Sequence, residues 1–159
     1  MYERGVHVRP PRPGDKEVLA ELIYRFYMLN EEFDPLWTLK DDAKEAAAAE
    51  AEKIVAGGGG EIVLVAQVAE EVVGYIRGYI REMPLLANGR MAVVKEIYVK
   101  PQARRLGLGS LLLERFSEEA RRLGARAVAG EFPAQNAIAH RFYERLGFRS
   151  FMYTMIKEV

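Results

Sequence analysis

The sequence of 159 residues contains no cysteine. Disulfide scaffolds, thiolate zinc sites, iron–sulfur clusters and cysteine nucleophiles are therefore excluded. Histidine is nearly absent as well, because only His7 and His140 occur and they lie far apart in the sequence. We therefore expect no metal site.

Long apolar runs are also missing, since no stretch approaches the roughly 18 residues that a membrane helix needs. The first residues lack the apolar core of a secretory signal, so we expect a cytoplasmic protein with no membrane partner.

Neither sign of charge is in excess, because 23 Lys and Arg balance 23 Asp and Glu, which argues against a nucleic-acid partner. Residues 1–60 nevertheless carry 8 basic and 12 acidic side chains, against 15 and 11 in residues 61–159. This asymmetry fits two ligands of opposite charge, or simply a solvated surface.

Apolar periodicity predicts the elements of the first half. The alternation of apolar and polar residues predicts a strand at 6–8. Apolar residues at helical spacing predict a helix over 15–30 with Asp15 at its N-cap. Thr38 is expected to cap a second helix, which glycines 57–60 end. Three strands rich in β-branched and aromatic residues follow, with turns at Glu70-Glu71 and Asn88-Gly89: residues 61–68, 72–81 and 91–99.

The second half predicts a helix over 108–123, a strand over 125–130 and a helix around 139–146. One or two further strands are expected within 148–157. Strand 91–99, the following helix and strand 125–130 form a βαβ crossover. We predict one α/β (α+β) domain over residues 1–159, with a mixed, mostly antiparallel sheet of six to seven strands flanked by about four helices.

A glycine-containing loop follows strand 91–99 and opens directly into a helix. Gly107 and Gly109 let an anion approach the backbone closely, and the first N–H groups of the helix have no partner within it. Arg104 and Arg105 add charged donors, so the loop is suited to a diphosphate. The Walker lysine is missing, and Leu112 replaces the third glycine of a dinucleotide fingerprint. The alternative is a plain glycine-rich helix entry with solvated arginines.

A second segment, NAIAHRFYERLGF over 136–148, places an amide at the start of a helix and a tyrosine two turns later. Together the two segments resemble the GNAT superfamily of N-acetyltransferases, and the order of elements agrees from about residue 6 to 157. The resemblance implies an acyltransferase that moves acetyl from acetyl-CoA to a primary amine of a small molecule or of a peptide or protein. Similar family members act on protein N-termini, polyamines or aminoglycosides.

The resemblance also implies roles for individual residues. The pantetheine arm would pair with the backbone of Ile97, Tyr98 and Val99, and Asn136 would hydrogen-bond the arm. Tyr143 would contact the thioester and protonate the leaving thiolate, although a core aromatic is the alternative at this position. The pyrophosphate would lie on a run of loop and helix residues: Arg104, Arg105, Leu106, Gly107, Leu108, Gly109 and Ser110.

Glu96 is the candidate base, acting on the amine directly or through water, and a solvated strand residue is the alternative reading. Four other acids compete for a role near the acceptor: Glu31, Glu32, Asp34 and Glu131. Three aromatic residues are candidates for the acceptor pocket or for the core: Phe33, Trp37 and Tyr79. Without a cysteine no acetyl-cysteine can form, so we expect the amine to attack the thioester in a ternary complex.

Two other functions remain open from the sequence. The chain could be a catalytically weak coenzyme A-binding sensor or regulatory module, or a structural domain whose glycine turn binds nothing. The terminal strands are suited to pairing across a homodimer, although the sequence does not require one.

Overall fold

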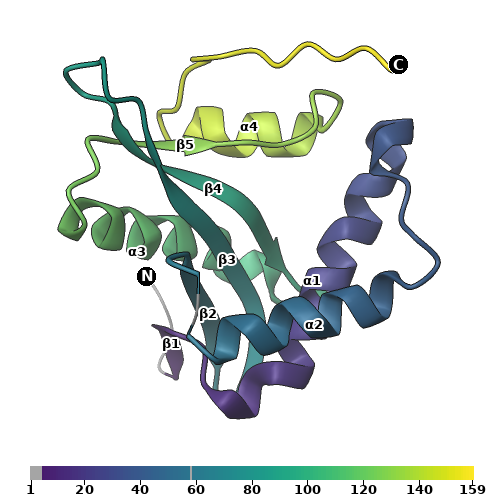
Figure 1. The fold of residues 1–159 in the computed structure, drawn as a ribbon. Helices are drawn as coiled ribbons and strands as arrows, with labels where there is room; N and C mark the ends of the chain where they lie inside the picture. Colours follow the sequence, from purple (N-terminus) through teal and green to yellow (C-terminus); the bar gives the residue numbers. More distant parts are fainter. Residues whose placement is uncertain (1–4, 58) are drawn as a thin grey trace.

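The computed structural model describes residues 5–57 and 59–159, which form a five-stranded sheet in the order β1-β2-β3-β4-β5 with helices on both faces (Figure 1). The strands are β1 (Val6–Arg9), β2 (Ile62–Val68), β3 (Glu71–Glu82), β4 (Arg90–Val99) and β5 (Ala127–Gly130). The α-helices are α1 (Lys16–Asn30), α2 (Ala43–Val55), α3 (Leu108–Arg122) and α4 (Ala137–Arg145). The predicted helices and the first five predicted strands are therefore confirmed to within a few residues.

The sheet is mixed in the predicted sense. Strands β1 to β4 pair antiparallel, whereas β4 and β5 pair parallel and are joined through α3. The expected βαβ crossover is thus present. A parallel pair needs such a long connection because its second strand must start at the same end of the sheet as the first.

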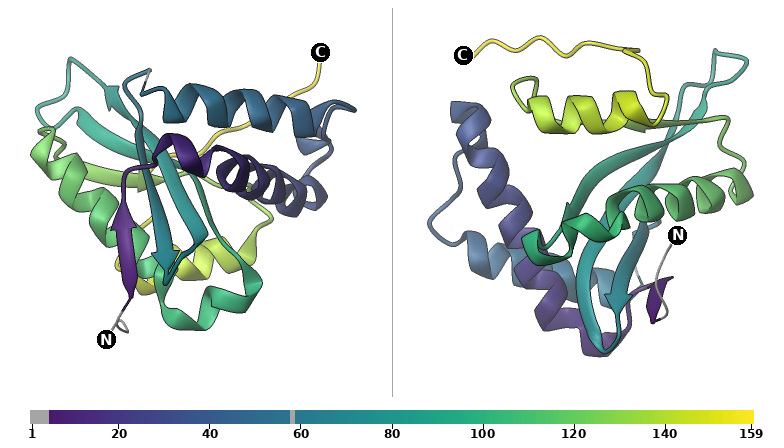
Figure 2. Two further views of the ribbon diagram at one scale, coloured as in Figure 1. Left: turned by 90° about the horizontal axis from the view of Figure 1, so that it is seen from below. Right: turned by 180° about the vertical axis from the view of Figure 1, so that it is seen from behind.

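Successive residues of β3 supply two separate cores, because neighbouring side chains of a strand point to opposite faces. Tyr75 packs with α1 and α2, where Leu19, Leu22 and Ile23 are buried. Ile76 packs on the other face with α3 and with Tyr143 of α4. Two views show α1 and α2 side by side on one face and α3 on the other (Figure 2).

Two predicted helix caps have other roles. Asp15 precedes α1, but its carboxylate accepts hydrogen bonds from the Arg9 guanidinium at 2.8 and 3.1 Å and from the Arg12 backbone N–H at 2.6 Å. Thr38 does not cap α2, which begins after Asp42; the Thr38 hydroxyl donates to the carbonyl oxygen of Pro35 at 2.7 Å. Asp15 thus occupies the predicted N-cap position of α1, but its side chain bonds to β1 and to its own loop instead of to the helix amides, and Thr38 bonds within its own loop.

The strands expected within 148–157 are absent, so the sheet has five strands instead of six or seven. From Ser150 to Val159 the chain has no regular structure and runs extended past α4 (Figure 1). Phe151, Met152, Tyr153, Met155 and Ile156 are all exposed. A segment with strand propensity becomes a strand only where it can pair with the edge of a sheet. Within the described residues this segment pairs with neither edge of the sheet.

No helix in the described part of the chain is long and apolar enough to cross a membrane. Over the same residues, no group of three or more His, Cys, Asp or Glu side chains is arranged to hold a metal ion.

Candidate active site

Strands β4 and β5 part at the pair Val94 and Gly130. One further hydrogen bond, from the Glu131 N–H to the Val94 carbonyl oxygen at 3.2 Å, ends the contact. On its other edge β4 stays paired with β3 as far as Val99, with Lys95 as the extra residue of a bulge. Beyond Val94, no described strand covers the β5-facing edge of β4. Ile97, Tyr98 and Val99 therefore lie along the open edge that the family resemblance requires.

The glycine loop ends at the entrance to α3. A short 3-10 helix, η4 (Pro101–Leu106), leads to Gly107, whose φ of 69° is left-handed. This conformation costs an L side chain roughly 1–2 kcal/mol, so glycine is the suitable residue. The first N–H groups of α3 have no acceptor within the helix and lie at the positive end of its dipole. A helix start of this kind can bind an anion.

The side chains of this loop do different things. Leu108 is fully buried, so only its backbone can face a ligand. Arg104 is tied back to β4, because its Nε donates to the Val99 carbonyl oxygen at 2.9 Å and its guanidinium lies 5.5 Å from the centre of the Tyr98 ring. Arg105 is exposed and forms no ion pair with the described residues, which leaves its charge available to an anion.

Gly109, the second glycine of the loop motif, lies within the first turn of α3. A Cβ placed on it would come 3.3 Å from the ring of Phe142 in α4. The predicted phosphate-loop glycine therefore also allows α4 to pack closely on the start of α3.

Tyr143 lies where β4 and β5 part. Its ring rests on Gly130, where an added Cβ would come within 2.4 Å of it. Phe132 stacks on the ring at 5.3 Å between centroids, and Phe148 meets it edge-on at 5.1 Å. Burial raises the pKa of Tyr143 well above its usual value of 10. The hydroxyl makes no hydrogen bond within the described part of the chain, so it is a protonated donor without a protein acceptor.

Asn136 is the N-cap of α4. Its Oδ1 accepts a hydrogen bond from the Ala139 N–H at 3.1 Å, and its Nδ2 donates to Oδ1 of the buried Asn30 at 3.3 Å. The amide therefore joins α4 to the end of α1. One Nδ2 hydrogen is left for the role in binding that the resemblance implies.

Glu96 has a side chain with no exposed surface. The hydroxyl of Tyr27 donates to its Oε2 at 2.7 Å, and the hydroxyl of Tyr75 donates to its Oε1 at 2.9 Å. The Arg77 guanidinium lies 3.4 Å from Oε2. A buried carboxylate needs such donors to offset its lost hydration. The alternative of a solvated strand residue is therefore wrong, and Glu96 does not meet solvent directly.

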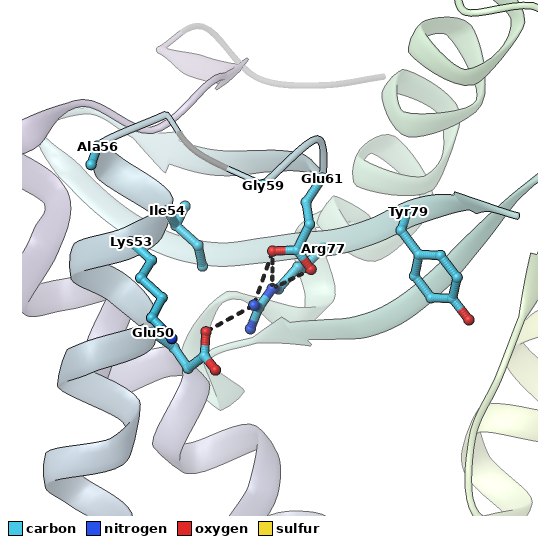
Figure 3. Close-up of a pocket in the computed structure, with 8 residues that line it drawn as sticks. All are labelled: Glu50, Lys53, Ile54, Ala56, Gly59, Glu61, Arg77 and Tyr79. Atoms are coloured by element: carbon cyan, nitrogen blue, oxygen red, sulfur yellow. Dashed lines mark hydrogen bonds and ion pairs between the residues drawn. The ribbon is translucent and has the colours of Figure 1, made fainter.

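Arg77 holds two further carboxylates besides Glu96. Glu50 of α2 lies 3.0 Å from its Nη2, and Glu61, just before β2, lies 2.9 Å from the same atom (Figure 3). Burial acts to lower the pKa of Arg77, but the hydrogen bond with Glu61 and the charge of Glu96 outweigh it and raise the pKa above its usual value. The guanidinium is therefore a permanent cation shared by three acids.

Sequence reasoning missed this cluster, which we call the Arg77 network: Tyr27, Glu50, Glu61, Tyr75, Arg77 and Glu96. A signal was available, because Tyr75 and Arg77 are two residues apart in a strand and so share a face. An arginine on the inward face of an otherwise apolar strand requires acidic partners.

Two cavities meet at the Arg77 network. The smaller, of about 420 Å³, lies between α1, α2 and the loop after η3 (Pro35–Trp37), with walls that include Tyr24, Tyr27, Trp37, Glu50, Arg77 and Lys95. The larger, of about 600 Å³, shares Glu50 and Arg77 and extends to Tyr79 (Figure 3). Trp37 and Tyr79 line cavities, and Trp37 also packs against the core, whereas Phe33 lines neither cavity; a role in binding the acceptor stays a prediction. The smaller cavity reaches Lys95, next to the point where β4 and β5 part.

Three of the four rival acids are engaged elsewhere. Glu31 and Asp34 accept hydrogen bonds from backbone amides of their own loop at 2.7 and 2.9 Å. Glu131 forms an ion pair with Arg81 at 2.9 Å. Glu32 is exposed and lines neither cavity.

Comparison with known proteins agrees with this geometry. A family model described as the acetyltransferase (GNAT) family matches residues 21–148. An L-methionine sulfoximine/L-methionine sulfone acetyltransferase of Salmonella typhimurium (strain LT2) is 39% identical over 59 residues, which are 37% of this chain and 34% of that protein. The match thus spans about a third of that relative's length.

Two solved structures share the fold over almost their whole length. The aminoglycoside N-acetyltransferase AAC(6')-Iy in complex with CoA superposes with a TM-score of 0.78 at 16% identity, covering 100% of this chain and 99% of that one. A ribosomal-protein-alanine N-acetyltransferase from Brucella melitensis biovar Abortus 2308 gives 0.73 at 17%, covering 97% and 99%. The matched family region contains the parted strands, the Gly107 loop and α4, and we conclude that the chain belongs to the acetyltransferase (GNAT) family.

Proposed function

We propose that this protein transfers the acetyl group of acetyl-CoA to a primary amine at the point where β4 and β5 part. The observation that carries the proposal is the position of Tyr143, whose ring lies on Gly130, the last β5 residue paired with β4. An unbonded phenol therefore lies where the edge of β4 opens, and the first turn of α3 packs on Phe142, the residue next to Tyr143. Family membership supports the same reaction class.

The residues present fit acetyl-CoA, which supplies the activated acetyl thioester. The uncovered edge of β4 from Ile97 to Val99 offers backbone groups to the amides of the pantetheine arm. The left-handed Gly107 and the first amides of α3 offer donors to the pyrophosphate, with the exposed Arg105 beside them.

Tyr143 is proposed as the general acid. Burial raises its pKa, so the phenol keeps its proton at neutral pH, and its hydroxyl has no acceptor in the described part of the chain that would compete with the leaving thiolate. Glu96 is proposed as the base, acting through an intermediary since its carboxylate is sealed from solvent. A Glu96→Gln enzyme whose pH–rate profile keeps its acidic limb would remove Glu96 from this role.

The amine attacks the thioester directly, because the chain has no cysteine to carry the acetyl group. Initial rates at varied acetyl-CoA and amine concentrations test this step. Intersecting lines in double-reciprocal plots are expected, and parallel lines would contradict direct transfer. Binding of acetyl-CoA with no product from any amine would favour the sensor alternative.

The acceptor is proposed to enter the cavity between α1 and α2. The relatives named above act on an aminoglycoside, on a ribosomal-protein alanine and on L-methionine sulfoximine or sulfone, so their names do not choose among acceptors. The walls of the cavity offer aromatic faces at Tyr24 and Trp37 and a carboxylate at Glu50. The same walls also carry Lys40, Arg77 and Lys95, and Glu50 is paired with Arg77, so the charge of the lining does not select the acceptor.

A further inference from the structure

Glu96 is closed off from the cavity by the groups that bind it. Of its three donors, Tyr75 has no exposed surface, whereas Tyr27 and Arg77 line the smaller cavity. Arg77 cannot exchange a proton near neutral pH, because its guanidinium stays charged. Tyr27 is therefore the one residue among these three donors that lines the cavity, donates to Glu96 and can pass a proton.

We propose that Tyr27 relays the proton from the acceptor ammonium to Glu96, an inference that rests on the proposed function. The N–H bond of the ammonium breaks and its proton bonds to the phenolic oxygen. The phenolic proton moves at the same time to Oε2 of Glu96, 2.7 Å away. The nitrogen keeps the electron pair with which it attacks the thioester. One cation and one carboxylate are neutralised, Tyr27 is unchanged, and no other reactant is consumed.

The Tyr27 ring is held in place for this transfer. Trp37 stacks on it with centroids 5.7 Å apart, and Phe26 meets it edge-on at 5.2 Å. Burial, together with the charge of Glu96 and the hydrogen bond to it, raises the pKa of Tyr27 above its usual value of 10. The ground state is therefore the phenol, and the two proton transfers occur together without a free phenolate.

The Arg77 network lets Glu96 accept the proton. The groups that face its carboxylate are Tyr27 from α1 and Tyr75 and Arg77 from β3. When Glu96 becomes neutral, Arg77 is still paired with Glu50 and Glu61, both closer to it than Glu96 is. Protonation therefore leaves no unpaired buried charge, which would otherwise cost several kcal/mol.

Two matched variants test the relay. Tyr27→Phe and Tyr75→Phe each remove one hydroxyl that donates to Glu96, but only Tyr27 borders the cavity. The probe is the amine that the unmodified protein acetylates fastest among an aminoglycoside, a polyamine and a peptide with a free N-terminus. We expect Tyr27→Phe to lower kcat about 10²-fold with an unchanged KM for acetyl-CoA, and Tyr75→Phe to lower it less than about tenfold.

The pH dependence separates a relay from a structural role. The loss of kcat in Tyr27→Phe, relative to the unmodified protein, is expected to shrink as the pH rises toward the pKa of the acceptor, because more of the amine is then already neutral. A deficit that is constant with pH, equal losses in the two variants, or full activity of Tyr27→Phe would overturn the relay while leaving the proposed function standing. If the unmodified protein acetylates none of the three amines, the proposed function fails and the relay fails with it.

Discussion

The ring of Tyr143 lies against Gly130 so closely that a Cβ at residue 130 would come within 2.4 Å of it. This contact joins α4 to the end of β5, at the pair where β5 leaves β4. The proposed acid and the opening between the strands are therefore placed by the same two residues. A change at either one should affect both packing and catalysis.

Gly130→Ala tests this contact. The new methyl group must push the Tyr143 ring away from the opening, and the ring is confined by Phe132 and Phe148. We expect a loss of about 1–3 kcal/mol in unfolding free energy and a marked fall in kcat. Gly14→Ala is the control, since nothing lies within 4 Å of a Cβ there. Equal stability and activity of the two variants would show that the contact is unimportant.

Gly107→Ala tests the anion site at the start of α3. An alanine in the left-handed conformation is expected to cost about 1–2 kcal/mol, and the altered backbone should also weaken acetyl-CoA binding. Gly124→Ala is the matched control, because Gly124 has a φ of 88° at the opposite end of α3. Both variants should lose similar stability in urea unfolding, but calorimetry should find weaker binding only for Gly107→Ala. Unchanged binding in both would argue against a phosphate site at the N-terminus of α3.

Tyr143→Phe tests the acid. Because the hydroxyl has no protein partner in the described part of the chain, its removal should leave the melting temperature almost unchanged. The value of kcat should fall about 10²-fold while the affinity for acetyl-CoA is kept. Since burial raises the pKa of Tyr143 above 10, the acid stays protonated at neutral and mildly alkaline pH. An unchanged kcat in Tyr143→Phe would contradict the acid role, and an alkaline limb near pH 8 that the variant abolishes would contradict the raised pKa.

Asp15 makes the stability pH-dependent. Its hydrogen bond with Arg9 lowers its pKa below the usual value of 3.8, so the unfolded chain binds this proton more readily than the folded one. The stabilisation that the pair of Asp15 and Arg9 gives to the folded protein is fully present above pH 4. It is lost as the pH falls through the pKa that Asp15 has in the folded protein, which is the lower of its two pKa values. Urea unfolding between pH 5 and pH 2 should show this loss, and Asp15→Asn should flatten that part of the curve. A curve that Asp15→Asn leaves unchanged would exclude the pair as its cause.

The sequence predicted well whatever depends on local pattern. Helical spacing located α1 and α3, and runs of β-branched and aromatic residues between turn signals located β2 to β4. The strand, glycine loop and helix around Gly107 could be read directly, because turn glycines and periodicity are local signals. The family motifs singled out Tyr143, which lies at the opening between β4 and β5, and its role stays a prediction.

What failed depends on long-range partners. The strands expected within 148–157 need a sheet edge, and propensity does not reveal whether one is offered. The burial of Glu96 depends on α1 and β3, with Tyr27 69 positions away in the sequence. The caps differ from these cases, because their competing partners are close in sequence: Asp15 stands at the N-cap of α1 but bonds to Arg9, and Thr38 bonds to Pro35.

Mass spectrometry of amines incubated with the purified protein and acetyl-CoA, with Tyr143→Phe in parallel, tests the central claim most directly. Transfer at the opening between β4 and β5 predicts an acetylated amine with the unmodified protein and far less with the variant. No acetylated amine from any member of the panel, or equal amounts from the two proteins, would contradict it.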